Sequence, residues 1–427
     1  MNAIASHLAS IIGTDAVYSW DSLPLSQQHL IQPALTPGKT PSCVVYPRTQ
    51  TQLAEVITNA NNHKWRVLPC GSGTKLHWGG LAENIDVVVS TEKINQLIEH
   101  AVGDLTITVE AGMRFSQIQE ILGTAKQAIA LDPYSPKSAT IGGIVATADT
   151  GSLRQRYGSV RDQLLGITFV RADGQIAKAG GRVVKNVAGY DLMKLFTGSH
   201  GTLGIISQVT FRVYPLPETS ATVVLTGNIE AISQAATILK SSALTPTQAD
   251  LISSKLVSQL NLGQGMGLIT RFQSINESVK EQSNRLLEIG KKLGLHNEIY
   301  AADNEAHLWQ RLPEIIHDST PNTAITCKIG VLPTAATQVL TEIETGVIHL
   351  SSGLGLVRLE NQNQVLALRQ LCQSHYGFLT VLSAPTTIKS QIDIWGYTGN
   401  ALDVIHRIKK QFDNNYILSP GRFVNGI

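Results

Sequence analysis

The chain has 427 residues, of which 43% are hydrophobic and 15% charged, and its formal net charge is +2. A chain of this length exceeds one ordinary hydrophobic core, so we expect two or three domains. The near-neutral net charge argues against a nucleic-acid-binding surface. The sequence contains no run of about 18 uncharged apolar residues, so we predict no membrane-spanning helix.

The four cysteines are scattered through the sequence, at Cys43, Cys70, Cys327 and Cys372. They form no C-x-x-C pair, which favours a reducing compartment and argues against an iron–sulfur cluster carried by this chain. The first residues lack the basic start and long apolar run of a secretion signal. We therefore expect a cytoplasmic protein, and peripheral membrane contact through a partner stays open.

Residues 1–37 predict an N-terminal extension with one short helix followed by a proline-containing loop. A β–α–β unit follows. Its strands are predicted at 43–47 and 65–68, and the helix between them spans about 14 residues and opens with a capping box of Thr49 and Gln52.

The second predicted strand ends in a glycine-bearing loop, Pro69–Lys75. Glycine has no Cβ, so a ligand can approach the main chain, and successive N–H groups can surround an anion. The end of a β–α–β strand is a common place for a nucleotide phosphate. Strand-like runs then follow at 85–89, 94–97 and 106–110.

A second glycine-bearing loop, Ala139–Ile144, lies about seventy residues further on, after a predicted helix at 115–122. The small apolar run 144–148 predicts a helix or an extended segment that could lie flat against a planar ligand. Strands are predicted at 164–170 and 175–179, joined by an Asp173-Gly174 turn, and a last strand ends at Val213.

The remaining half of the chain alternates helices with strands. Helices are predicted at 229–239, 277–293, 365–372 and 402–412, and strands at 324–331, 355–359, 378–382 and 391–395. This alternation favours an α+β domain with an antiparallel sheet.

Six motifs, in this order along the chain, resemble those of a known protein family. They are P-x-G-x-G-T at 69–74, T-I-G-G at 140–143, Y-G at 157–158, V-x-A-D-G at 170–174, G-Y-D-L at 189–192 and G-S-x-G-T-L-G at 198–204. Residues 38–217 thereby resemble the FAD-binding domain of the vanillyl-alcohol-oxidase/PCMH-type flavoproteins. The longer string V-V-K-N-V-A-G-Y-D-L-x-K-L-F-T-G-S, which begins at Val183, is similar to the FAD-binding (E) subunit family of glycolate oxidase.

This resemblance implies an α+β fold with four parts. After the extension at 1–37, a PCMH-type FAD-binding domain at 38–217 would combine a small β-α-β subdomain with a mixed or antiparallel sheet flanked by helices. An α+β cap domain with an antiparallel sheet would follow at 218–401, and residues 402–427 would return toward the flavin.

The resemblance also implies which residues hold the cofactor, FAD. They are Pro69, Gly71, Ser72, Gly73, Thr74, Lys75, Thr140, Ile141, Gly142, Gly143, Lys185, Gly189, Tyr190, Gly201, Gly204 and Ile206. Some relatives tether the flavin through a histidine at the position of Gly73, so FAD should be non-covalent here, although nearby His77 keeps a tether open. Tyr190 could instead only fix its loop, and Lys185 could be a solvated surface charge.

The catalytic residues stay unknown, with Arg358, Arg422 and Lys185 as weak candidates. Arg422 lies in S-P-G-R at 419–422, half of a motif that ends many relatives. Relatives that act alone on 2-hydroxy acids carry H-x-G-x-G-x-x-H in the cap, and this chain does not. Its six cap histidines are dispersed, so we predict no metal site.

These features are typical of a subunit that takes part in oxidation of glycolate or a similar 2-hydroxy acid, with electrons passing through FAD. The expected partners resemble the flavin-bearing D subunit and the iron–sulfur F subunit of glycolate oxidase. Two alternatives stay open. The chain could be a self-sufficient dehydrogenase of another alcohol or hydroxy acid, or a non-catalytic scaffold of the same complex.

Overall fold

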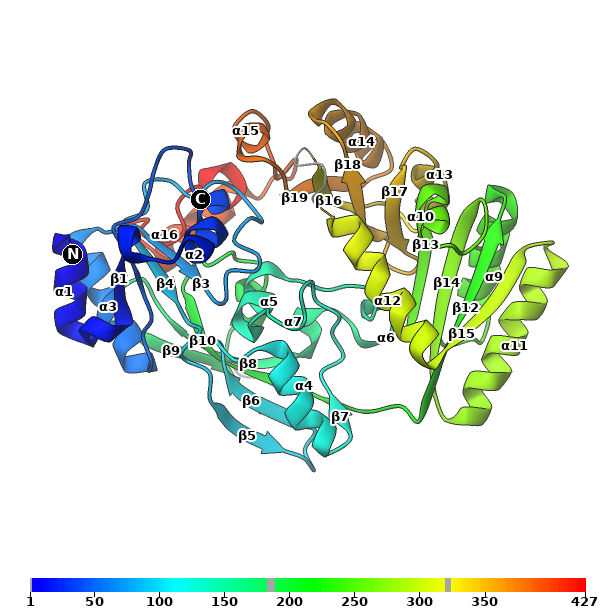
Figure 1. Ribbon diagram of the computed structural model, residues 1–427, viewed down its shortest axis with the longest axis horizontal. Coiled ribbons are helices and arrows are strands. Elements are labelled where there is room, and N and C mark those ends of the chain that lie inside the picture. The colour runs from blue at the N-terminus through cyan, green and yellow to red at the C-terminus, as the bar shows by residue number, and fades with distance from the viewer. Residues whose placement is uncertain (1, 183–188, 319–323) are drawn as a thin grey trace. The chain divides into compact units, whose positions relative to one another are not determined.

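A computed structural model of the protein describes residues 2–182, 189–318 and 324–427 (Figure 1). The chain divides into two compact units. The first comprises Met1–Gly151, Ser159–Leu216 and Tyr397–Ile427, and the second comprises Ser152–Gly158 and Pro217–Gly396. The short segment Ser152–Gly158 thus belongs with the second unit, although residues of the first unit flank it in sequence.

A four-stranded sheet in the order β1-β2-β4-β3 opens the first unit. Its strands are β1 (Val17–Ser19), β2 (Cys43–Val45), β3 (Val67–Cys70) and β4 (Val87–Ser90). β2, β4 and β3 run parallel, so β2 and β3 need a crossover, which α3 (Gln50–His63) supplies. The amide of Gln52 donates to Thr49 Oγ1 at 3.1 Å, so the predicted β–α–β unit and its helix cap are confirmed.

The N-terminal residues form α1 (Ala3–Ile12) and α2 (Leu25–Ile31). Apolar side chains of α1 share one core with those of α3 and with strands β2, β3 and β4. The short helix predicted near the N-terminus is therefore confirmed, and it packs within the first unit.

A five-stranded antiparallel sheet in the order β5-β6-β10-β8-β9 completes the first unit. Its strands are β5 (Leu97–Ala101), β6 (Thr106–Glu110), β8 (Leu164–Val170), β9 (Ile176–Gly180) and β10 (Ile205–Arg212). The helices that share its core are α4 (Phe115–Thr124), α5 (Ile141–Thr147), α7 (Val160–Gln163) and α8 (Leu192–Phe196). A small pair, β7 (Gln127–Ala128) with β11 (Tyr214–Pro215), lies outside this sheet.

The strand predicted over 94–97 is displaced along the chain, because β5 begins only at Leu97 and residues 94–96 are not in a strand. Ile94 lies in a turn, where its amide donates to the carbonyl of Thr91 at 2.9 Å and its own carbonyl accepts from Gly112 at 2.8 Å. Its side chain is fully buried, so the sequence predicted the burial of Ile94 correctly but predicted the wrong backbone conformation.

The second unit is built on an eight-stranded antiparallel sheet in the order β15-β12-β14-β13-β17-β18-β16-β19 (Figure 1). Its strands are β12 (Thr219–Gly227), β13 (Gln248–Ile252), β14 (Met266–Ser274), β15 (His296–Ala301), β16 (Ile325–Gly330), β17 (Thr345–His349), β18 (Leu354–Leu359) and β19 (Phe378–Ser383). The antiparallel sheet expected for the cap is therefore confirmed.

Helices cover both faces of this sheet. One core includes α9 (Ile229–Ser241), α11 (Asn276–Lys292), α13 (Ala336–Thr341) and α14 (Gln362–Ser374). A second core on the other face includes α10 (Ser254–Gln259) and α12 (Ala302–His317). Two short helices, α6 (Arg154–Tyr157) and α15 (Thr386–Lys389), complete the unit.

The strand predicted over 391–395 is also wrong. The carboxylate of Asp393 accepts from the amides of Trp395 at 3.0 Å and Gly396 at 3.1 Å. A side chain that satisfies nearby backbone donors in this way favours a turn over a sheet ladder. Sequence reasoning also missed α12, which contains Pro313 within the helix.

The C-terminal helix α16 (Leu402–Phe412) carries a buried ion pair. Lys409 Nζ donates to Asp413 Oδ2 at 2.7 Å, and also to the carbonyls of Thr202 and Leu418 at 2.8 Å each. The exposed fractions of the two charged side chains are 1% and 0%, so hydration stabilises neither charge appreciably.

The chain beyond this pair runs beside β3. Val67 donates to the carbonyl of Ile417 at 2.7 Å, and Ser419 donates to the carbonyl of Val67 at 2.8 Å. Because β3 ends in the first glycine loop, the ion pair places the last residues of the chain next to that loop.

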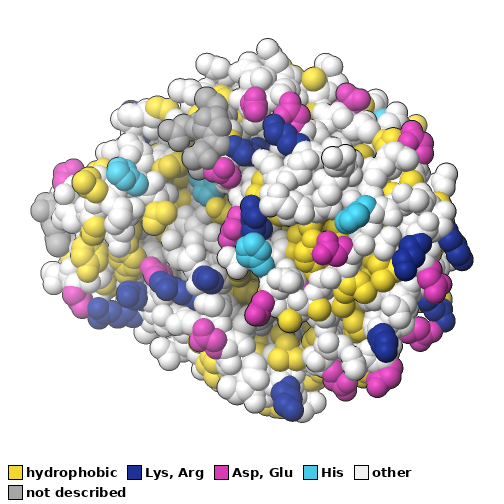
Figure 2. All heavy atoms as spheres, turned by 45° about the vertical axis from the view of Figure 1, so that its right-hand side comes forward, with side chains coloured by type: hydrophobic (Ala, Val, Ile, Leu, Met, Phe, Trp, Pro, Cys, Tyr) yellow, Lys and Arg dark blue, Asp and Glu magenta, His cyan; other side chains and the backbone are white. Residues whose placement is uncertain are grey.

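Charged side chains of both signs are spread among uncharged ones on the face drawn in Figure 2. Within the described residues, no helix combines the length and the apolar character needed to cross a membrane.

Lys409→Met should destabilise the first unit strongly. The change leaves Asp413 as a buried carboxylate without its cation, and breaking a buried pair costs about 3–5 kcal/mol. Urea unfolding should therefore show a lower midpoint for this variant. The matched control is Lys410→Met, because Lys410 is exposed on the same helix and should change the unfolding free energy by less than about 0.5 kcal/mol. Equal midpoints for the two variants would contradict the role given to the pair.

Candidate cofactor site

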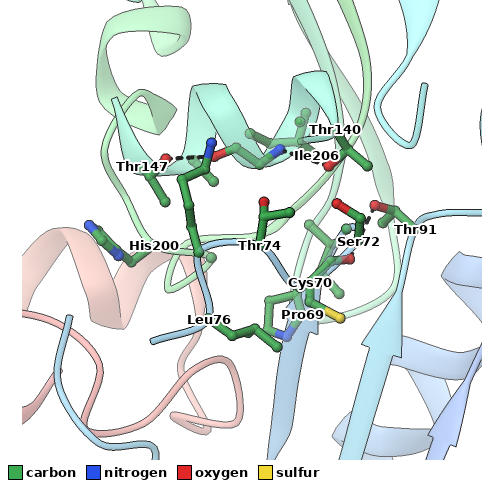
Figure 3. A pocket seen from close by; sticks show the side chains of 18 of the residues that line it. Pro69, Cys70, Ser72, Thr74, Leu76, Thr91, Thr140, Thr147, His200 and Ile206 are labelled. Atoms are coloured by element: carbon green, nitrogen blue, oxygen red, sulfur yellow. Dashed lines mark hydrogen bonds between the residues drawn. The ribbon is translucent and has the colours of Figure 1, made fainter. Parts of the chain in front are cut away.

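Both glycine-bearing loops line one cleft in the first unit (Figure 3). The cleft holds about 680 Å³ of space that opens to solvent. Its walls come from the loop after β3, the loop and first turns of α5, the turn before β10, and the C-terminal segment. The lining residues are Pro69, Cys70, Gly71, Ser72, Gly73, Thr74, Lys75, Leu76, Thr91, Thr140, Gly142, Gly143, Ala146, Thr147, His200, Gly201, Gly204, Ile205, Ile206 and Arg422.

The two loops touch because residue 71 is glycine. A Cβ on Gly71 would lie 1.9 Å from Oγ1 of Thr140, far inside contact distance. Beside this contact, Ser72 Oγ donates to the carbonyl of Ser138 at 2.6 Å, which ties the first loop to the approach of the second. The first loop therefore contacts the second loop directly at the cleft.

Helix α5 forms a second wall, and Gly142 allows it to lie close to the neighbouring backbone. The amide of Gly142 donates to the carbonyl of Ala111 at 2.8 Å, and a Cβ there would come within 2.7 Å of the Ala111 methyl group. The run 144–148, for which the sequence left helix or extended chain open, is helical up to Thr147 and ends with Ala148 in the left-handed conformation.

The turn before β10 forms the third wall. Gly201 has φ +73°, and a Cβ on it would meet Pro69 at 2.6 Å, so this turn also packs directly on the first loop. His200 lies next to it at the cleft and has φ +51°. Ile205 and Ile206 begin β10 and supply an apolar part of the lining.

Lys75 is paired within the wall of the cleft. Its Nζ lies 2.8 Å from Oδ2 of Asp149, and the two side chains are 4% and 8% exposed. Asp149 Oδ2 also accepts from the amide of Tyr134 at 2.9 Å. The Lys75 charge is therefore already compensated by a carboxylate.

Arg422 is charged and buried without a carboxylate. Its two terminal nitrogens donate to the carbonyls of Gly80, at 2.6 Å, and Trp78. Its Nε is buried and has no hydrogen-bond partner among the described residues. No carboxylate of the described residues lies within ion-pair distance of Arg422. Burial lowers the pKa of Arg422 to about 10, which still leaves it protonated at neutral pH. A buried cation of this kind favours an anion in the adjoining cleft.

Twelve of the sixteen residues predicted to hold the cofactor line this cleft. Ile141 does not, because its side chain is fully buried in the core beneath α5. Gly189 and Tyr190 are also absent from the lining, and Tyr190 is 89% exposed. Lys185 lies outside the described residues.

The two arginines proposed as weak catalytic candidates have different surroundings. Arg422 lines the cleft, whereas Arg358 lies on β18 in the second unit with its Nη1 3.8 Å from Oδ2 of Asp318. The structure therefore gives Arg358 a carboxylate of its own.

The cleft also has lining residues that sequence reasoning did not select. They are Cys70, Leu76, Thr91, Ala146, Thr147, His200, Ile205 and Arg422, the last having been considered only as a weak catalytic candidate. Cys70 lies within the predicted loop Pro69–Lys75 and Leu76 directly follows it, so their position in the sequence could have indicated them. Thr91 follows β4, and its position in the sequence gives no such indication. Burial raises the pKa of the Cys70 thiol to about 12, so this thiol is neutral at ordinary pH.

No group of three or more histidine, cysteine, aspartate or glutamate side chains in the described part of the chain is arranged to hold a metal ion. The polar lining of the cleft instead consists of hydroxyl groups, main-chain groups, the Cys70 thiol, the His200 imidazole and the two cations Lys75 and Arg422.

The fold and the cleft define a two-unit α+β protein whose first unit has a cleft lined by two glycine-bearing loops and two buried cations. Residues 41–180 match the family model of the FAD binding domain. The chain therefore carries an FAD-binding domain, and its cofactor is FAD.

Characterised relatives match part of the chain. Glycolate oxidase subunit GlcD of Bacillus subtilis (strain 168) is 30% identical over 260 residues, which cover 61% of this chain and 53% of the relative. The mitochondrial D-lactate dehydrogenase (cytochrome) of Arabidopsis thaliana is 28% identical over 281 residues, which cover 63% and 49%. The chain thus spans about half the length of these relatives.

Among solved structures, p-cresol methylhydroxylase with substrate bound superposes with a TM-score of 0.75. The superposition covers 98% of this chain and 96% of that protein at 17% identity, a likeness that shows the fold alone.

Two structural observations indicate that the residues around the cleft are suited to hold FAD. The contact of Gly71 with Thr140 leaves bare main chain where a diphosphate could be held, and no side chain could be added at residue 71 without opening the cleft. Arg422 lines the cleft as a buried cation, and its positive charge would suit a diphosphate.

Gly71→Ala should release FAD. The added methyl group would force the loops apart at Thr140, so we expect purified protein to lose most of its bound flavin, measured as flavin absorbance per protein. Gly103→Ala is the matched control, because nothing lies within 4 Å of a Cβ there. Retention of full flavin by Gly71→Ala would show that the loop contact does not shape the site.

Proposed function

We propose that this protein is an FAD-binding subunit that takes part in oxidation of glycolate or a similar 2-hydroxy acid to the 2-oxo acid. The observation that carries the proposal is the cleft in which two glycine loops meet beside a buried, uncompensated arginine. The names of the two sequence relatives support the substrate class, since both act on small 2-hydroxy acids.

In this proposal the main chain of both loops binds the diphosphate. Gly71, Ser72, Gly73 and Thr74 contribute from the first loop, and Thr140, Gly142 and Gly143 from the second. Ile206, at the start of β10, would lie along the adenine. Gly73 offers no side chain for a covalent tether, so the flavin is held non-covalently.

FAD supplies a hydride acceptor when bound, which oxidation of an alcohol requires. The residues of this chain bind and orient the group. Arg422 offsets the negative charge of the diphosphate, and the Lys75–Asp149 pair keeps the first loop in place. Ile205, Ile206 and Leu76 exclude water from the apolar part of the cleft.

The proposal assigns the chain to a hetero-oligomer. The sequence lacks the H-x-G-x-G-x-x-H motif, which its self-sufficient relatives carry, so repeated turnover is proposed to depend on partners. These partners resemble the D and F subunits of glycolate oxidase. A D-type relative among the matches is consistent with such an assembly.

Two other functions make different predictions. A self-sufficient dehydrogenase of another alcohol or hydroxy acid would turn over alone with an artificial acceptor. A scaffold subunit would assemble with the partners yet work equally well without flavin. The intact glycine cradle argues against the scaffold, because an empty cradle leaves buried N–H groups unmatched.

The purified chain should be yellow and show little or no glycolate:dye turnover alone, and should gain turnover when D-type and F-type partners are added. The measurement is dye reduction with glycolate, D-lactate and related acids. Rapid turnover by the single chain would select the self-sufficient dehydrogenase instead.

Arg422→Met should weaken FAD binding by roughly 10- to 100-fold. A hydrogen bond to a charged group contributes about 1.5–3 kcal/mol, and each 1.4 kcal/mol is about tenfold in the dissociation constant. The measurement is an FAD titration of apoprotein. Arg407→Met is the matched control, since Arg407 is exposed on α16. An unchanged dissociation constant for Arg422→Met would remove Arg422 from the cofactor site.

A further inference from the structure

Two histidine side chains meet on the surface of the first unit. His7 lies on α1, and His63 is the last residue of α3. The two helices lie side by side (Figure 1), and the centroids of the two imidazole rings are 5.2 Å apart. Both residues are exposed, and neither lines the cofactor cleft. The cofactor site therefore leaves this pair of histidines without a role.

We propose that His7 and His63 form a binding site for a divalent transition-metal ion, and that Zn²⁺ is the ion that the geometry favours. The site is independent of the FAD cleft and of the proposed function. The prediction of no metal site was drawn from the dispersed histidines of the cap, and these two residues lie outside the cap.

The hydrogen bonds of Asn59 determine the tautomer of both rings. Its Nδ2 donates to the carbonyl of Glu55 at 2.9 Å, so the amide oxygen Oδ1 faces His7. An amide oxygen can only accept, so Nε2 of His7, 2.9 Å away, carries the proton. Nδ1 of His63 lies 2.9 Å from the backbone carbonyl of Asn59, which is also an acceptor, so this nitrogen carries the proton of the second ring.

Each neutral ring is left with one unprotonated nitrogen. These nitrogens are Nδ1 of His7 and Nε2 of His63, and neither has a hydrogen-bond partner among the described residues. The unprotonated nitrogen of a neutral imidazole is the atom that ligates a metal ion. A hydrogen bond from the opposite N–H to a carbonyl is the usual support of a metal-ligating histidine, because it fixes the tautomer and the ring orientation.

The separation of the rings fits one shared ion. Imidazole nitrogens ligate zinc at about 2.0–2.1 Å, and the centre of each ring lies about 1.1 Å beyond its nitrogen, so two ring centroids around one tetrahedral ion are about 5 Å apart. The observed centroid distance of 5.2 Å agrees with this value. Packing of α1 on α3 thus already supplies the spacing that shared ligation requires.

Trp65 restrains both rings. Its indole stacks on His63 with centroids 4.5 Å apart and an interplanar angle of 13°. The same indole meets His7 at 5.6 Å and 79°. Side chains that are already held in place lose less conformational freedom on binding, so this packing favours ligation.

Water would complete the coordination of the ion. The described residues contain no group of three histidine, cysteine, aspartate or glutamate side chains suited to a metal, so the chain contributes the two imidazoles. The ion would join α1 to α3, the helix that connects β2 to β3. An ion that binds only the folded chain stabilises it, so we expect the metal to stabilise the first unit.

Calorimetric titration with zinc chloride tests the site on untagged, FAD-loaded protein. Wild-type protein should bind one more zinc ion than the double variant His7→Gln/His63→Gln, and each single substitution should weaken that site by at least tenfold. His29→Gln is the matched control, because His29 is an exposed histidine on α2 of the same unit. FAD content should be the same in all variants. Equal zinc binding by the wild type and the double variant overturns the proposal.

Electron paramagnetic resonance with Cu²⁺ counts the ligating nitrogens. Copper binds imidazole sites more tightly than zinc does, and nitrogen ligands split its spectrum. We expect two nitrogen ligands in the wild type and in His29→Gln, and one or none in each single variant of the pair. Asn59→Ala keeps both rings but removes the acceptor of His7, so it should weaken binding by about tenfold or more. A wild-type spectrum that persists in the double variant places the ion elsewhere and refutes the site.

Thermal unfolding tests the link between the helices. Zinc at about ten times its dissociation constant should raise the melting temperature of the wild type and of His29→Gln by about 2–5 °C. The double variant should show no such rise. A rise of equal size in the double variant would show that zinc stabilises the chain at another place, and it would overturn the proposal.

Discussion

The cofactor cleft depends on one steric constraint, the direct contact of Gly71 with Thr140. A Cβ on Gly71 would lie 1.9 Å from the threonine oxygen, so the two loops meet only because one of them has no side chain at this point. The first loop continues strand β3 of the parallel-rich sheet, and the second leads into α5, which packs on the antiparallel sheet. The contact therefore joins the two sheets of the first unit and creates the cleft at their junction.

Two buried cations complete the site in different ways. Lys409 is fully paired: it holds Asp413 and two carbonyls and thereby aligns the end of the chain with β3. Arg422, a few residues later, donates only to carbonyls, and its buried Nε has no partner among the described residues. The first cation stabilises the fold, and the second leaves a positive charge that a diphosphate would satisfy.

The elements that were predicted well are those whose local signals agree with their tertiary surroundings. Helix α3 has both a capping residue and a complete apolar stripe, and strands β6 and β8 are continuous apolar or β-branched runs. The errors lie where side chains compete with the backbone or where burial occurs without a strand. Asp393 turns the chain where a strand was expected, and Ile94 is buried within a turn. Apolar character reports burial, and it does not by itself report the backbone conformation that achieves burial.

The sequence alone determined the class of fold, the FAD-binding domain and most of the loop residues at the cleft, because glycine spacing, capping residues and hydrophobic periodicity are local properties. The tertiary structure decided which of these residues face the cleft: it placed Ile141 in the core and Tyr190 at the surface, and it brought Thr91 and Arg422 to the lining. It also brought His7 and His63 together on neighbouring helices. Contacts between residues so far apart in sequence are set by strand register and by the packing of distant segments, which no local pattern encodes.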